Sequence, residues 1–146
     1  MGVSIANPPR FLQAPDEHAR LLHPAGPGLV VLARRDGRWQ EQRIPVEALP
    51  ERVRPLAGCP EVFLTQNRFR GPRRIAHLVG LDALWADLNY HRLPQWVGWR
   101  PEGIWELAIA HLEAARIPAP TLAIATGRGL CLLWVHSSVP RQALPR

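Results

Sequence analysis

Proline restricts the secondary structure of this chain more than any other residue type, because 16 of its 146 residues are proline. A proline lacks a backbone donor, breaks the interior of a helix and is excluded from central strands. Helices and strands are therefore expected to be short or to lie between prolines. Residues 1–28 are predicted to be an irregular lead-in with a short helix near Asp16–Leu22, since they contain Pro8, Pro9, Pro15, Pro24 and Pro27.

Beyond residue 28, short apolar runs alternate with turn signals. Asp36-Gly37 is a hairpin signal between an apolar strand at 28–33 and an alternating strand at 39–44. The spacing of apolar residues predicts an amphipathic helix at 101–116. Further elements are expected as a helix at 45–56 and strands at 61–66, 84–90, 121–125 and 130–135. This mixture indicates an α/β or α+β domain over 29–146. We expect the α+β class, with a mixed or antiparallel sheet, a C-terminal β-hairpin and flanking helices.

Composition excludes several classes of protein. Hydrophobic residues make up 47% of the chain and charged residues 21%, which suits a packed core. No apolar run approaches the roughly 18–20 residues that cross a bilayer, and the N-terminus lacks a signal-peptide pattern, so no membrane partner and a cytoplasmic location are expected. Cys59 and Cys131 have no metal-site spacing and are interpreted as reduced thiols.

The charge points to a polyanionic partner. All 18 basic residues are arginine, the net charge is +6 and the sequence pI is about 11.1. Such a balance favours nucleic acid or nucleotides. A GC-rich genome explains why arginine replaces lysine, but it does not explain the positive excess.

An acidic residue stands inside the predicted strand 84–90. A buried, unpaired carboxylate is costly, so Asp87 needs a reason to be there. Residues two apart in a strand share a face, which places Asn89 beside Asp87. Two oxygen ligands side by side suit a hard cation such as Mg²⁺. The alternative is that Asp87 caps a loop at the end of the strand.

A glycine turn joins the last two predicted strands. Thr126, Gly127, Arg128 and Gly129 form it, and Cys131 follows on the second strand. Glycines allow positive φ and close approach to a ligand, and turn N–H groups can hold phosphate oxygens. Arg128 at the tip can add a bidentate contact. The alternative is an ordinary two-stranded ribbon.

Together, residues 62–74, 84–91 and 126–134 resemble the plasmid and phage replication proteins of the archaeo-eukaryotic primase superfamily. In that family a strand ends in an Asp-x-Asp or Asp-x-Glu pair that binds the catalytic metals. The resemblance implies a primase-polymerase-like lobe in which Asp87 is catalytic and, with Asn89, holds Mg²⁺ or Mn²⁺. It also implies that the 126–131 turn binds a nucleoside triphosphate.

The chain departs from the family pattern at two positions. Asn89 replaces the second carboxylate, and Cys131 stands where a histidine contacts the triphosphate of the incoming nucleotide. The family's third carboxylate is expected beyond Arg146, so residues 29–146 are interpreted as an incomplete catalytic core.

A cluster of arginines precedes the Asp87 strand. Arginine beside an aromatic residue is typical of nucleic-acid grooves. We therefore expect this segment to bind nucleic acid, and its alternative is a solvated loop; the cluster comprises Arg68, Arg70, Arg73 and Arg74, with Phe69 among them. Among the histidines, His91 is the best functional candidate because it follows Asp87 by four positions.

Two functions follow from these observations. The first is template-directed nucleotidyl transfer in DNA replication, with divalent metal, nucleoside triphosphates and single-stranded or primer-template DNA. A replication helicase or a further C-terminal part would be its partner. The second is a catalytically inactive module that binds single-stranded nucleic acid in a mobile-element replication protein.

Overall fold

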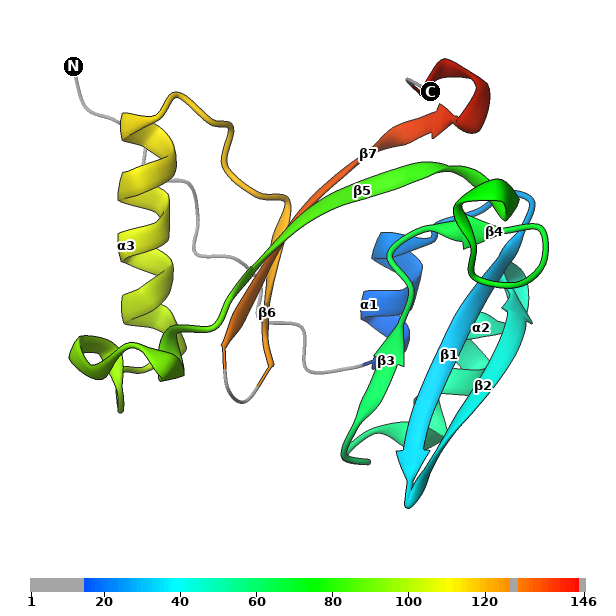
Figure 1. Cartoon of the computed structure of the whole chain (residues 1–146), viewed down its shortest axis with the longest axis horizontal. Coiled ribbons are helices and arrows are strands. Elements are labelled where there is room, and N and C mark those ends of the chain that lie inside the picture. The colour runs from blue at the N-terminus through cyan, green and yellow to red at the C-terminus, as the bar shows by residue number, and fades with distance from the viewer. Residues whose placement is uncertain (1–14, 127–128, 145–146) are drawn as a thin grey trace. The chain divides into compact units, whose positions relative to one another are not determined.

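The computed structural model describes residues 15–126 and 129–144 (Figure 1). Its helices are α1 (Pro15–Leu22), α2 (Leu49–Val53) and α3 (Pro101–Ala114). Its strands are β1 (Leu29–Asp36), β2 (Arg38–Pro45), β3 (Val62–Leu64), β4 (Arg68–Phe69), β5 (Leu78–Leu88), β6 (Leu122–Ala125) and β7 (Leu130–Pro140). Short 3₁₀ helices occupy Val46–Ala48, Arg54–Leu56, Ile75–His77, Tyr90–Arg92, Pro94–Trp96 and Arg141–Ala143.

The strands of the described residues form one seven-stranded sheet. Its order is β2-β1-β4-β5-β7-β6, and β3 also pairs with β1. The pairs with a defined register are antiparallel: β1 with β2, β3 and β4, β4 with β5, and β6 with β7. The predicted α+β class, with an antiparallel sheet and a C-terminal hairpin, is confirmed.

The chain divides into two compact units, which are described separately below. The larger unit contains the described residues 15–84 and 135–144, and the smaller unit contains 85–126 and 129–134. Strands β5 and β7 contribute residues to both units. No helix of the described residues is long and apolar enough to cross a membrane.

The core of the larger unit lies between one face of β1–β2 and the helices α1 and α2. Val30, Leu32 and Ile44 are buried on that face. They pack against residues of α1, α2 and the preceding 3₁₀ helix, namely Ala19, Val46, Leu49 and Val53. The hairpin tip is Gly37, whose φ of 69° suits glycine in a tight turn.

Prolines cut the predicted helix 45–56 into three pieces. A 3₁₀ turn, α2 and a second 3₁₀ turn follow one another along this segment. Pro50 lies in the first turn of α2 and Pro55 in the first turn of the last piece. A proline is tolerated there because the N–H it lacks has no partner within the helix. The expectation of one continuous helix was therefore wrong.

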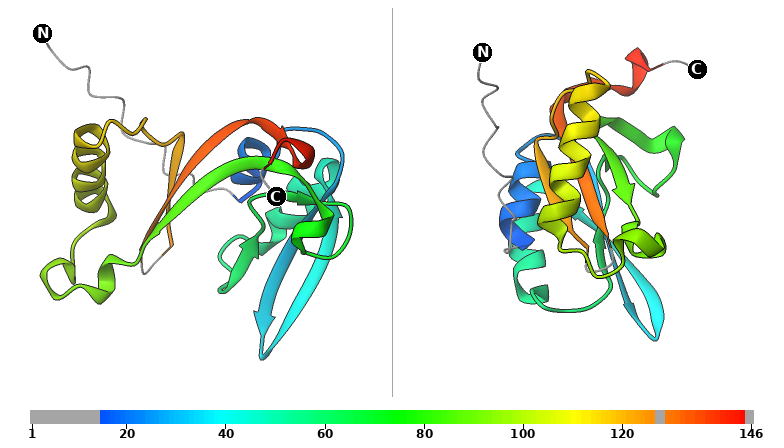
Figure 2. Two further views of the ribbon diagram at one scale, coloured as in Figure 1. Left: turned by 45° about the horizontal axis from the view of Figure 1, so that its top comes forward. Right: turned by 90° about the vertical axis from the view of Figure 1, so that its left-hand side faces the viewer.

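The smaller unit is built on α3 and the β6–β7 hairpin. Figure 2 shows α3 lying along the hairpin, and the buried Ile104 packs there with Ala123, Leu130 and Leu132. Pro101 begins the helix at the position where proline is favoured. Trp134 donates its indole N–H to the carbonyl of Pro118 at 2.7 Å, which ties β7 to the α3–β6 connection.

Strand β5 is longer than predicted, because it begins at Leu78 rather than at residue 84. The added residues include Gly80 and Asp82, which are uncommon in strands. A Cβ on Gly80 would lie 2.6 Å from Ser138 Oγ and 2.7 Å from the carbonyl oxygen of Val139. Glycine is thus required by the close approach of β7, which also extends beyond its predicted end to Pro140.

Candidate functional site

Asp87 lies on the solvent side of the end of β5. Ala86 and Leu88 pack against the core of the smaller unit, so strand alternation turns Asp87 outward. The carboxylate is exposed and carries no burial penalty. The expectation that burial makes this carboxylate exceptional was therefore wrong, although its position at a strand end agrees with the sequence.

Asn89 meets Asp87 in a different way from the one predicted. The strand ends at Leu88, and Asn89 has φ −79° and ψ 55° before the 3₁₀ helix Tyr90–Arg92. Its Nδ2 donates a hydrogen bond to Asp87 Oδ2 at 3.1 Å. The two side chains are adjacent, but an amide N–H, rather than a second oxygen, faces the carboxylate. A half-turn of the amide exchanges its O and N.

Gly129 brings the glycine turn against the Asp87 segment. A Cβ on Gly129 would lie 2.6 Å from the carbonyl oxygen of Leu88 and 3.5 Å from Cα of Asn89. Real Cβ atoms do not approach backbone so closely, so only glycine fits. Gly129 is therefore needed for contact with the chain's own backbone, whereas the sequence suggested turn conformation or approach to a ligand.

Thr126 closes the hairpin. Its backbone N–H donates to the carbonyl oxygen of Gly129 at 3.0 Å. This N–H is therefore already used within the turn. The sequence had suggested that N–H groups of the turn could hold phosphate oxygens, and this one is not free to do so. The Thr126 side chain is exposed. Gly127 and Arg128 lie outside the described residues.

Cys131 is half-buried on β7. Burial, together with the negative charge of Asp87, raises the pKa of the Cys131 thiol to about 11. The thiol is therefore neutral near pH 7, and it neither carries positive charge nor acts as a nucleophile there.

The residues fit one hard cation better than two. Asp87 offers a carboxylate, and Asn89 offers an amide oxygen after a half-turn. Mg²⁺ is often held by one or two carboxylates plus substrate phosphates. Among the described residues, no group of three or more His, Cys, Asp or Glu side chains converges as a metal cage. A cation here would depend on phosphate oxygens for much of its coordination.

His91 follows in the 3₁₀ helix Tyr90–Arg92. Its Nδ1 is buried and has no hydrogen-bond partner among the described residues. A buried nitrogen without a partner is uncommon in folded proteins. His91 therefore stays a candidate, and its role is still a prediction.

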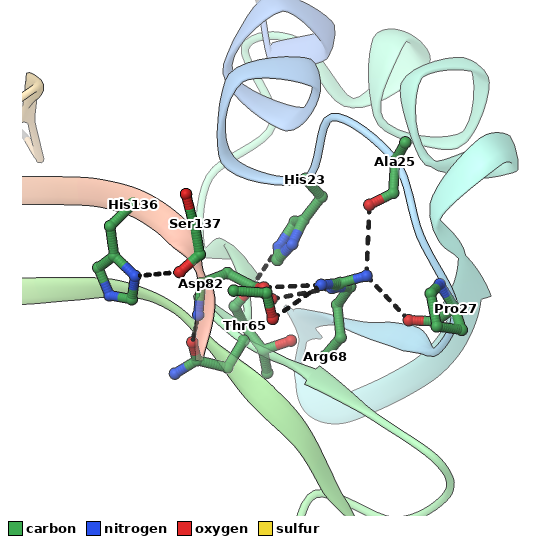
Figure 3. A network of polar contacts seen from close by, with 10 residues as sticks. His23, Ala25, Pro27, Thr65, Arg68, Asp82, His136 and Ser137 are labelled. Carbon is green, nitrogen blue, oxygen red and sulfur yellow. Dashed lines mark hydrogen bonds and ion pairs between the residues drawn. The ribbon is translucent and has the colours of Figure 1, made fainter. Parts of the chain in front are cut away.

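Arg68 belongs to the interior rather than to a nucleic-acid surface. Only 6% of the residue is exposed. Its Nε and Nη2 donate to the two carboxylate oxygens of Asp82 at 2.9 and 2.7 Å (Figure 3). Its Nη1 donates to the carbonyl oxygens of Ala25 and Pro27 at 3.3 and 3.0 Å. With its donors committed in this way, Arg68 is removed from the predicted nucleic-acid site.

Asp82, unlike Asp87, is a buried carboxylate. Burial by itself would raise the pKa of Asp82. Hydrogen bonds from Arg68 and Ser138, together with the charge of Arg68, outweigh burial and hold the pKa of Asp82 below its ordinary value. The backbone N–H of Asp82 also donates to Asn67 Oδ1 at 2.8 Å. This network joins β4, β5 and β7 within the larger unit.

The remaining arginines of the cluster are exposed. Arg70, Arg73 and Arg74 lie on the surface of the larger unit. Arg73 forms a long, exposed ion pair of 4.0 Å with Glu41. Such pairs contribute only about 0–1 kcal/mol, so they leave the guanidinium able to exchange its partner for a phosphate. Asp87, in contrast, belongs to the smaller unit.

Comparison with known proteins gives one relevant similarity. A replication protein from Clostridium perfringens is 31% identical to this chain over 85 residues, which are 58% of this chain. The matched part is 20% of the length of that protein, so the chain spans about a fifth of this relative. No family model matches the chain, and no solved structure matches it.

Proposed function

We propose that this chain is the nucleotide-handling part of a DNA replication protein of the primase-polymerase type. The contact of Gly129 with the Leu88–Asn89 backbone carries the proposal, because it holds the glycine turn beside Asp87. The similarity to a replication protein supports the same class of function. The chemistry would be template-directed nucleotidyl transfer with nucleoside triphosphates and primer-template DNA.

Each residue of the site has a role that its chemistry allows. Asp87 and the oxygen of Asn89 would hold Mg²⁺ or Mn²⁺ together with the triphosphate. When bound, such an ion neutralises phosphate charge. Arg128 would contact the triphosphate through its guanidinium. The neutral thiol of Cys131 would only line the site. Separately from this site, Arg70, Arg73 and Arg74 of the larger unit would hold the DNA backbone through charge.

A second function is favoured by the same two substituted positions. Asn89 brings no negative charge, and Cys131 stays neutral near pH 7. Without phosphate oxygens to complete the coordination, a single carboxylate offers a cation few ligands. The alternative is a module that binds single-stranded nucleic acid without nucleotidyl transfer.

One experiment separates the two functions. Triphosphate binding and primer extension with Mn²⁺ are measured for the wild type, Asp87→Ala, and the double variant Asn89→Asp/Cys131→His. We expect Asp87→Ala to abolish triphosphate binding and the double variant to extend primers faster than the wild type. Glu113→Ala, which removes another exposed carboxylate from the same unit, is the control and should behave like the wild type.

A negative result is equally informative. If no variant binds a triphosphate or extends a primer while DNA binding is retained, nucleotidyl transfer is ruled out and the binding module remains.

A further inference from the structure

One face of the larger unit's sheet is exposed near the β1–β2 hairpin tip. The strand register pairs Arg35 with Trp39, and Ala33 with both Glu41 and Phe63. Directly paired residues point to the same side, so all five side chains share one face. Val30 and Leu32 alternate with them and point to the opposite face, into the core with α1 and α2.

Two large aromatic rings lie side by side on this face. The ring centroids of Trp39 and Phe63 are 5.6 Å apart, with 52° between their planes. Trp39 is on β2 and Phe63 is on β3, and β1 runs between these two strands. At this position β1 carries the small side chain of Ala33, which leaves room for the rings to meet. Trp39 is 56% exposed and Phe63 is 53% exposed. Exposed aromatic neighbours of this kind mark interaction surfaces.

Positive charge surrounds the aromatic pair. The Arg35 guanidinium lies 6.0 Å from the centroid of the Trp39 ring. Arg43 pairs with Val31 on the same face of β1–β2 and is exposed. Arg73 reaches Glu41 on this face.

The nearby carboxylates do not block these guanidinium groups. Glu61 lies 3.7 Å from Arg35, and Glu41 lies 4.0 Å from Arg73. Both pairs are exposed, and exposed pairs at such distances contribute little in water. Arginine can therefore exchange them for phosphate oxygens, which it binds with a planar, bidentate fork.

We propose that this surface, the Trp39–Phe63 face, binds single-stranded nucleic acid. Unpaired bases would stack on Trp39 and Phe63, while Arg35, Arg43 and Arg73 would contact phosphates. Rings with arginines beside them are what single-strand-binding proteins use without reading sequence. A duplex is disfavoured, because its bases are already stacked on one another. The chain's net charge of +6 attracts a polyanion such as nucleic acid more strongly than it attracts a protein partner with few acidic residues.

This surface is independent of the proposed nucleotide site. Its residues all belong to the larger unit, whereas Asp87 and the glycine turn belong to the smaller one. Loss of triphosphate binding in Asp87→Ala therefore leaves the Trp39–Phe63 face untouched, and loss of this face leaves triphosphate binding intact.

The test is fluorescence anisotropy of a labelled oligothymidylate of about 12 nucleotides, within the range of single-strand site sizes. Trp39→Ala and Phe63→Ala should each weaken binding at least about fivefold, as expected for the loss of one stacked base. Trp39→Phe keeps a ring and should recover most of the affinity. Arg43→Gln should weaken binding and reduce the slope of affinity against salt by about one phosphate contact.

The control is Trp99→Ala, which removes another exposed tryptophan, 47% exposed, from the smaller unit. It should bind the oligonucleotide like the wild type. Thermal unfolding of each variant confirms that it is folded. Wild-type affinity in Trp39→Ala/Phe63→Ala would overturn the proposal, as would equal affinity for duplex DNA. Loss of self-association in that variant with oligonucleotide binding unchanged would assign the face to protein contact instead.

Discussion

Gly129 packs against the carbonyl oxygen of Leu88 so closely that a Cβ on Gly129 would lie 2.6 Å from it. This contact holds the β6–β7 turn against the end of β5. Asp87 and Asn89 flank Leu88, so the placement of the turn beside these two side chains depends on the absence of a side chain at residue 129.

Gly129→Ala is expected to destabilise the smaller unit by about 1–3 kcal/mol, because backbone has to move to admit the methyl group. It should also weaken triphosphate binding. Gly103→Ala is the matched control, since its Cβ would meet only the ring of Trp99, at 3.3 Å. Alanine is favoured over glycine in a helix by up to about 1 kcal/mol, so this variant should be neutral or stabilised. Urea unfolding measures both, and equal stability of the two variants would contradict the close-contact argument.

Breaking the buried pair of Arg68 and Asp82 should strongly lower the free energy of unfolding. Arg68→Met leaves the Asp82 carboxylate without its partner in the interior, which costs about 3–5 kcal/mol. Arg34→Met is the control, because Arg34 forms an exposed pair with Asp36 at 3.5 Å and exposed pairs are worth about 0–1 kcal/mol. Chemical denaturation compares the two. A loss below about 1 kcal/mol in Arg68→Met would show that the pair is not buried as described.

Two histidines of the larger unit should make the free energy of unfolding depend on pH. Burial lowers the pKa of His18 and of His23 below the ordinary value of 6.5. The folded chain therefore resists protonation that the unfolded chain accepts. Stability should be constant above pH 6.5 and fall as the pH decreases from 6.5 toward the lowered values.

The change at low pH can be assigned to His18 by substitution. His18 Nε2 is buried without a hydrogen-bond partner among the described residues, so His18→Leu removes a titrating group without breaking a bond of that nitrogen. This variant should lose less stability than the wild type between about pH 7 and about pH 5. His23→Gln can still donate to the Thr65 carbonyl, which His23 Nε2 contacts at 2.8 Å. An unchanged pH profile in both variants would refute the assignment.

Asp82 and Asp87 show where reasoning from sequence succeeds and fails. The cost of burying a carboxylate in an apolar strand is a sound argument, but it applies to Asp82, which is 6% exposed. Asp87, for which it was made, is exposed. A single sequence does not reveal that Arg68, fourteen positions away, supplies the partner. Asp82 itself was not considered, because no strand was expected over residues 78–83.

Local signals predicted local structure well. Two hairpins were predicted from Asp36-Gly37 and from the glycine turn, and α3 was predicted from its apolar spacing. All three are present, although β1 and β7 run further than expected, to Asp36 and Pro140. The full length of β5 was missed because Gly80 and Asp82 are disfavoured in strands, and only contacts with β7 and β4 explain them. The Trp39–Phe63 pair was missed for the same reason, since pairing across β1 is a tertiary property.

The thiol of Cys131 provides a test of the site's geometry. Because burial and the charge of Asp87 raise its pKa to about 11, its alkylation should accelerate with pH until about 11 rather than level off near 9.0. The Cys59→Ser background leaves Cys131 as the single cysteine, and mass spectrometry follows the reaction with iodoacetamide. Asp87→Asn should shift the profile to lower pH by removing the negative charge. A profile that ignores this substitution would place Asp87 away from the thiol.

Asn89→Asp is expected to strengthen cation binding at the Asp87 site. The new carboxylate would stand where the Asn89 amide now meets Asp87 Oδ2 at 3.1 Å. In water, a carboxylate and a divalent ion about 4 Å apart attract by about 2 kcal/mol, so Mn²⁺ should bind at least about tenfold more tightly. Calorimetric titration with Mn²⁺ measures this, and Asn89→Ala, which lacks both oxygen and charge, should bind no better than the wild type. If Asn89→Asp and Asn89→Ala bound Mn²⁺ equally, residue 89 would not face the cation, and the pairing of Asp87 with Asn89 would serve only to end the strand.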